Sequence, residues 1–86
     1  MKNINDYINN GTYVIKETIE DNNVIRLVEV YNTHTYSDEY IIFDIKTGNI
    51  IAETNSSDFG EIENLSDANM VYNALNNFIK ITNLTI

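Results

Sequence analysis

The segment "EYIIFDIKTGNIIAET" constrains the fold more than any other part of this sequence. Two runs rich in isoleucine, residues 39–45 and 49–54, flank Lys46-Thr47-Gly48. A glycine at this place supplies the left-handed residue that a type I turn followed by a bulge requires. We therefore predict a β-hairpin, and any fold of the chain must contain this antiparallel pair of strands.

A second hairpin is predicted upstream. Residues 13–20 alternate like a half-buried strand, with Tyr13, Ile15 and Ile19 on one face and Lys16, Thr18 and Glu20 on the other. Asp21-Asn22-Asn23 is typical of a turn, since asparagine tolerates positive φ. Residues 24–31 then form the second strand of this hairpin.

A short helix is predicted before the first strand. Residues 4–10 carry apolar side chains at the i, i+3 and i+4 spacing of one helix face. Asn3 or Asn5 is placed to cap this helix, and Gly11 is placed to end it.

Residues 66–81 form a longer helical pattern. Ser66 is placed to cap it, and Lys80 falls in its last turn, where the helix dipole favours a cation. One apolar stripe runs along it, made of Ala68, Val71, Tyr72, Leu75, Phe78 and Ile79. We predict a single α+β domain over residues 1–86: a short N-terminal helix, a four-stranded antiparallel sheet, and a C-terminal helix packed on one face, in two layers.

The net charge of the chain limits the classes of partner that it can bind. Thirteen acidic residues stand against five basic ones, which gives a formal net charge of −8. This charge disfavours direct binding to nucleic acid and to anionic membranes, and no apolar run approaches the roughly 18 residues of a membrane span. Without cysteine or a secretion signal, we expect a cytoplasmic protein. Acidity serves either solubility or a basic partner, and both interpretations stay open.

Catalytic and metal-binding patterns are sparse, and we predict neither an enzyme nor a cofactor. His34 is the only histidine and lies in a loop-like segment, so we expect a solvated side chain rather than a general base. Asp58-Phe59-Gly60 matches a kinase tripeptide, but the other kinase motifs are missing. We predict no metal site; a calcium site is the alternative left open, formed by Asp58, Glu61, Glu63 and Asp67, whose spacing does not match an EF-hand.

The best candidates for partner binding lie in two acidic segments, "YSDEY" and "DFGEIE". Aromatic rings beside carboxylates are typical of surfaces that bind arginine, although a solvated loop tip is the alternative. The predicted binding residues are Tyr36, Asp38, Glu39, Tyr40, Asp58, Phe59, Glu61 and Glu63.

The first half of the chain resembles a known family. "NINDYI", "YVIK", "NVIRLVEVYN" and "SDEYII", within residues 3–42, follow the order and approximate spacing of a small phage anti-CRISPR family that inhibits the type II RNA-guided DNA nuclease. The resemblance implies a compact non-enzymatic protein whose carboxylates occupy the arginine-lined site that reads the protospacer-adjacent motif. Only Asp38, Glu39 and Tyr40 match a binding segment of that family. Its acidic C-terminal helical hairpin is replaced here by a fourth strand and the acids at 58, 61 and 63.

Two functional hypotheses follow. In the first, the protein is an acidic inhibitor that mimics DNA and binds the arginines and lysines of a CRISPR effector in the host bacterial cytoplasm. In the second, it is a small soluble accessory or peptide- or ligand-binding domain whose acidity serves solubility. Acids of residues 36–40 and 58–67 gathered on one exposed face would favour mimicry; scattered acids, or acids paired with Arg26 and Lys46, would favour the second hypothesis.

Overall fold

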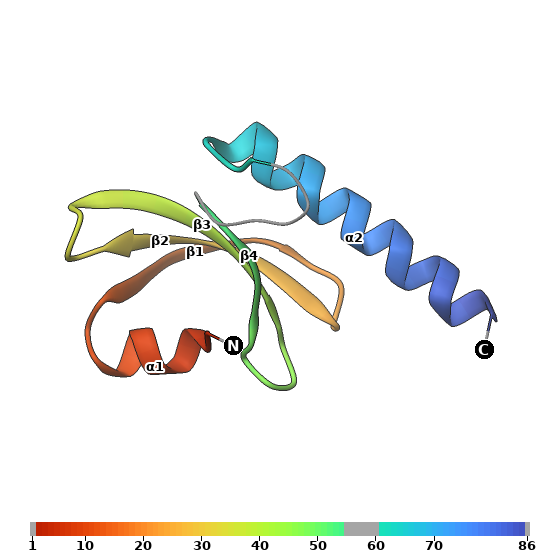
Figure 1. The fold of residues 1–86 in the computed structure, drawn as a ribbon, viewed down its shortest axis with the longest axis horizontal. Helices are drawn as coiled ribbons and strands as arrows, with labels where there is room; N and C mark the ends of the chain where they lie inside the picture. Colours follow the sequence, from red (N-terminus) through yellow and green to blue (C-terminus); the bar gives the residue numbers. More distant parts are fainter. Residues whose placement is uncertain (1, 55–60, 86) are drawn as a thin grey trace.

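The computed structural model describes residues 2–54 and 61–85, with side chains to residue 80. The elements are α1 (Ile4–Asn9), β1 (Tyr13–Asp21), β2 (Ile25–Asn32), β3 (Ser37–Asp44), β4 (Ile50–Glu53) and α2 (Leu65–Thr85). The strands form one antiparallel sheet in the order β1-β2-β3-β4 (Figure 1). The predicted α+β fold, with a short first helix and a long second one, is confirmed.

Both predicted hairpin turns are present. Gly48 has a φ of 81°, and Asp44 closes the turn through Oδ1, which accepts hydrogen bonds from the backbone N–H groups of Lys46 and Thr47. In the first hairpin, Asn23 has a φ of 71°, and the Oδ1 of Asn22 accepts hydrogen bonds from the backbone N–H groups of Val24 and Ile25. The side chains at these turns thus satisfy backbone donors that the strands leave unpaired.

The helices lie on opposite faces of the sheet, so the prediction of two layers is wrong (Figure 1). Neighbouring residues of a strand point to opposite faces, and β2 and β3 bury apolar side chains on both faces. The face that we call the α1 face carries Ile4, Tyr13, Val28, Val30, Ile41, Phe43 and Ile50. The other, which we call the α2 face, carries Ile25, Leu27, Ile42 and Ala52 beneath Ile62, Ala68, Val71, Tyr72 and Leu75.

Strand β1 differs from the simple alternation predicted for it. Its pairing with β2 shifts between Ile15 and Glu17 and again between Thr18 and Glu20. One extra residue in a strand reverses the alternation that follows it. Tyr13 therefore packs on the α1 face and Ile19 against the α2 face, whereas the sequence pattern placed them together.

Helix α1 is capped as predicted: the Oδ1 of Asn3 accepts a hydrogen bond of 2.9 Å from the backbone N–H of Asn5. Gly11, with a φ of 82°, follows its end. The backbone of residues 2–4 also bonds to the β3–β4 hairpin, because Ile4 N donates to Gly48 O and Ile50 N donates to Lys2 O. The first residues thereby join α1 to the edge strand β4.

Helix α2 departs from its prediction at both ends. Asn64, not Ser66, caps it, since the Asn64 Oδ1 accepts a hydrogen bond of 2.9 Å from Asp67 N. The helix continues to Thr85, so it runs past its predicted end at residue 81 and Lys80 does not lie in its last turn. Phe78 is 67% exposed and is not part of the buried stripe. Within residues 2–54 and 61–85, no helix combines the length and apolar character needed to cross a bilayer.

Candidate functional site

The "SDEY" segment is part of strand β3 rather than a loop. Asp38 and Tyr40 pair with Tyr31 and Glu29 of β2, on the α2 face. Glu39 pairs with Val30, whose side chain belongs to the α1 face. The three residues that the family resemblance groups together are therefore divided between the two faces of the sheet.

Tyr36 is the last residue of the turn between β2 and β3. It is 80% exposed and has a φ of 58°, which is uncommon for a residue other than glycine or asparagine. Asn32 holds the turn, because its Oδ1 accepts the backbone N–H groups of His34 and Thr35. His34 is exposed, as predicted.

A cluster that the sequence did not predict surrounds Asp38 and Tyr40 on the α2 face. Glu17 of β1 stands directly opposite Glu29 of β2, and Glu29 stands opposite Tyr40. Tyr31 stands opposite Asp38 in the next row. We call Glu17, Glu29, Tyr31, Asp38 and Tyr40 the acidic sheet patch.

The only basic side chain that the structure places within this patch is Lys16. Its Nζ forms an ion pair of 2.9 Å with the Oδ2 of Asp38, and both side chains are 43% exposed. The bond to Asp38 raises the pKa of Lys16, and the nearby Glu29 raises it further. Burial and the Glu29 carboxylate, to which it is hydrogen-bonded, raise the pKa of Tyr40. Like charges directly across two strands, such as Glu17 and Glu29, destabilise a sheet, and the single lysine is already engaged.

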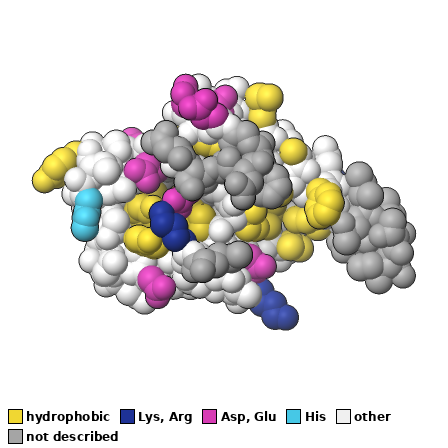
Figure 2. All heavy atoms as spheres, in the orientation of Figure 1, with side chains coloured by type: hydrophobic (Ala, Val, Ile, Leu, Met, Phe, Trp, Pro, Cys, Tyr) yellow, Lys and Arg dark blue, Asp and Glu magenta, His cyan; other side chains and the backbone are white. Residues whose placement is uncertain are grey.

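Glu61 and Glu63 lie elsewhere, beside the N-terminal end of α2. The Oδ2 of Asp67 accepts a hydrogen bond of 3.0 Å from Glu63 N. A hydrogen bond with Glu61 and the charges of Glu61 and Asp67 raise the pKa of Glu63. Figure 2 shows acidic side chains gathered over this end of the helix. Asp58 and Phe59 fall outside the described residues.

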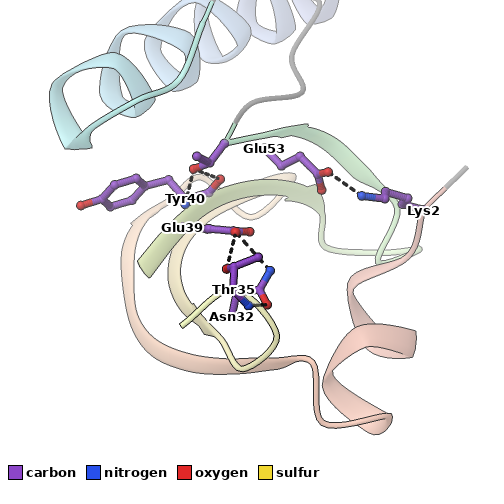
Figure 3. Close-up of polar contacts among 7 residues, drawn as sticks. Lys2, Asn32, Thr35, Glu39, Tyr40 and Glu53 are labelled. Carbon is purple, nitrogen blue, oxygen red and sulfur yellow. Dashed lines mark hydrogen bonds and ion pairs between the residues drawn. The ribbon is translucent and has the colours of Figure 1, made fainter. Parts of the chain in front are cut away.

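Glu39 belongs to a polar group on the α1 face (Figure 3). Its Oε2 accepts hydrogen bonds from Asn32 Nδ2 at 3.1 Å and from Thr35 Oγ1 at 3.5 Å. On neighbouring β4, Glu53 forms an ion pair of 2.7 Å with Lys2. The predicted acids thus do not all share one face, and the sequence criterion for mimicry is not met as it was stated.

The alternation of side chains along the strands could have identified Glu29 and Tyr31 from the sequence. Extending β3 back to residue 37 places them beside Asp38 and Tyr40. Glu17 carried no such signal, because its face depends on the bulge at Lys16.

Metal chemistry finds little support in the part of the chain that the structure describes. No three side chains among its single histidine and its carboxylates come together as a ligand set for a metal ion. Carboxylates and tyrosines on an exposed sheet instead suit hydrogen bonding and cation–π contact with arginine.

Comparison of the chain with known protein families, with curated proteins and with solved structures finds no significant match in any of the three.

Proposed function

We propose that this protein is a non-enzymatic inhibitor that acts in the host bacterial cytoplasm. It uses the acidic sheet patch to bind the basic nucleic-acid-binding surface of a CRISPR effector. The observation that carries the proposal is the direct opposition of Glu17 and Glu29 beside Asp38 on an exposed sheet face. A basic partner would relieve the repulsion between these carboxylates.

The chemistry of the patch suits arginine in particular. A guanidinium binds carboxylates through paired, charge-assisted hydrogen bonds, and its plane stacks on aromatic rings. Tyr31 and Tyr40 stand beside the carboxylates and offer such rings. A nuclease that holds DNA with arginines would lose those contacts while the patch occupies them, and the opposite fields would speed association.

A second candidate is a small accessory domain whose acidity serves solubility. The Lys16–Asp38 ion pair favours it, because Asp38 is already neutralised within the chain. The hydrogen bonds that Glu39 accepts from Asn32 and Thr35 favour it as well. The two candidates differ in whether Glu17 and Glu29 contribute to binding.

The test is a DNA-cleavage assay with a type II effector, run with wild-type protein and two double variants. Glu17→Gln with Glu29→Gln neutralises the patch. Asp6→Asn with Glu20→Gln removes the same amount of charge from exposed residues outside the patch. We expect the first variant to lose inhibition by about tenfold or more, since charge-assisted bonds are lost, and the second to inhibit like wild type.

Stability separates this result from a folding defect. Removing the Glu17–Glu29 repulsion should raise the melting temperature of the first variant while it lowers inhibition. Inhibition by wild type should also weaken at high salt. Equal inhibition by both double variants, or no binding of wild type to any effector, would favour the accessory domain.

A further inference from the structure

A different pair of carboxylates lies on the α1 face, away from the acidic sheet patch. Glu53 of β4 stands directly opposite Ile41 of β3, and Glu39 lies two residues before Ile41 on the same face. Glu39 and Glu53 are thus diagonal neighbours, and such pairs have Cβ atoms about 7–8 Å apart, close enough for long side chains to share one ligand. Figure 3 shows both side chains on this side of the sheet.

Glu53 is buried and only half satisfied. The residue is 6% exposed, and its Oε1 accepts the ion pair from Lys2. Its Oε2 is buried without a hydrogen-bond donor among the described residues. Polar atoms in such a position are rare in folded proteins, because losing water without gaining a donor is costly. Among the described residues, Asn32 and Thr35 both donate to the Oε2 of Glu39.

The chain itself shows which chemistry this site accepts. The Lys2 ammonium lies 2.7 Å from Glu53 Oε1 and 5.3 Å from the centre of the Tyr7 ring. The Tyr7 ring in turn lies 5.0 Å from that of Tyr13. Burial and the charges of Glu53 and Glu39 raise the pKa of Tyr13 to about 12. One ammonium against two carboxylates leaves one negative charge uncompensated.

We propose that Glu53 and Glu39 bind the guanidinium or primary ammonium group of a ligand beside Lys2. The ligand donates hydrogen bonds to Glu53 Oε2 and to the Oε1 of Glu39, next to the aromatic rings that already accept an ammonium. A divalent metal ion fits less well, because calcium takes about six to eight oxygen ligands and this site offers two carboxylates. Glu53 Oε2 is itself buried, but the Lys2 side chain beside it is 51% exposed and Glu39 is half-buried, so a cation reaches the site by moving the Lys2 side chain aside.

The test is a two-dimensional amide NMR titration of the whole chain with ethylguanidinium and with the tripeptide Gly-Arg-Gly, at constant ionic strength. We expect saturable shifts at Tyr13, Glu39 and Glu53 that Glu53→Gln weakens, whereas any shifts at Glu17, in the acidic sheet patch, should persist in that variant. Tighter binding of the tripeptide would assign the site to an arginine of a protein partner, and tighter binding of ethylguanidinium to a small organic cation. Either result supports a cation site.

Variants decide whether the carboxylates carry the binding. Glu53→Gln and Glu39→Gln should each weaken it about tenfold, whereas Glu29→Gln, on the opposite face, should not change it. Lys2→Met removes the competing ammonium and should tighten binding, an effect that a merely structural ion pair does not predict. The proposal is overturned if neither wild type nor Lys2→Met gives saturable shifts, or if Glu39→Gln, which keeps the buried Glu53, binds as wild type does.

Discussion

Two glycines share a backbone conformation but not an environment. Gly11 has a φ of 82° and Gly48 a φ of 81°. A Cβ added at Gly11 would meet nothing within 4 Å, whereas at Gly48 it would lie 2.5 Å from Asn5 Nδ2 and 2.8 Å from Asn3 Oδ1. Asn3 cannot move away freely, because it caps α1 and also donates to Thr47 O.

We therefore predict that Gly11→Ala and Gly48→Ala differ in cost. The left-handed conformation alone should lower the free energy of unfolding by about 1 kcal/mol in Gly11→Ala. Gly48→Ala should lower it by roughly 2–4 kcal/mol, since overpacking adds to the same backbone strain. Urea unfolding of both variants measures the difference, and equal losses would show that the Asn3 contacts yield without cost.

At the scale of elements, α2 packs through Leu75 rather than Phe78. Leu75 is 8% exposed and lies in the cluster of the α2 face, whereas two-thirds of Phe78 is exposed. Leu75→Ala should cost about 2–4 kcal/mol, and Phe78→Ala less than about 1 kcal/mol. Thermal and urea denaturation of the two variants compare them directly, and a larger loss for Phe78→Ala would contradict this packing.

Local patterns predicted which elements form, and they failed where a single residue changes the register. The hairpin at Lys46-Thr47-Gly48 needs only turn chemistry and flanking apolar runs, which are visible in the sequence. The bulge at Lys16 is set by pairing with β2, and no local pattern indicates it. The position of Glu17 on the candidate site could not be predicted for this reason.

The prediction that Phe78 is buried, made from the apolar stripe of α2, was wrong for a related reason. Phe78 follows the 3.6-residue period as well as Leu75 does, so periodicity assigned both to the core. Figure 1 shows that the C-terminal part of α2 extends past the sheet. The size of the sheet decides which part of the helix is covered, and the apolar stripe of the helix carries no information about it.

For the whole molecule, acidity makes stability depend on pH. Glu61 and Asp67 raise the pKa of Glu63 above 4.5, so the folded state binds a proton at Glu63 more tightly than the unfolded state does. The free energy of unfolding therefore rises as the pH falls toward 4.5. Hydrogen bonds from the Asn23 backbone and Arg26 lower the pKa of Asp21 below 3.8. Its contribution is present above pH 3.8 and is lost as the pH falls through that lowered pKa.

We predict that the melting temperature rises from pH 7 to about pH 5, as self-repulsion falls, and drops again below pH 4. Added salt should raise it at pH 7 by screening. Scanning calorimetry at low protein concentration measures the profile, and Glu63→Gln should reduce the rise. A melting temperature that decreases steadily from pH 7 downward would contradict the repulsion between these acids.

The bonds between the first residues and the β3–β4 hairpin also bear on the order of folding. Asn3 donates to Thr47 O across 44 positions of the chain, and Lys2 reaches Glu53 across 51. During synthesis, residues 2–9 leave the ribosome long before these partners exist. Closing a loop of this length delays the contacts that depend on it. The β1–β2 hairpin can pair as soon as it emerges, whereas the layer beneath α1 closes only after β4 has been made.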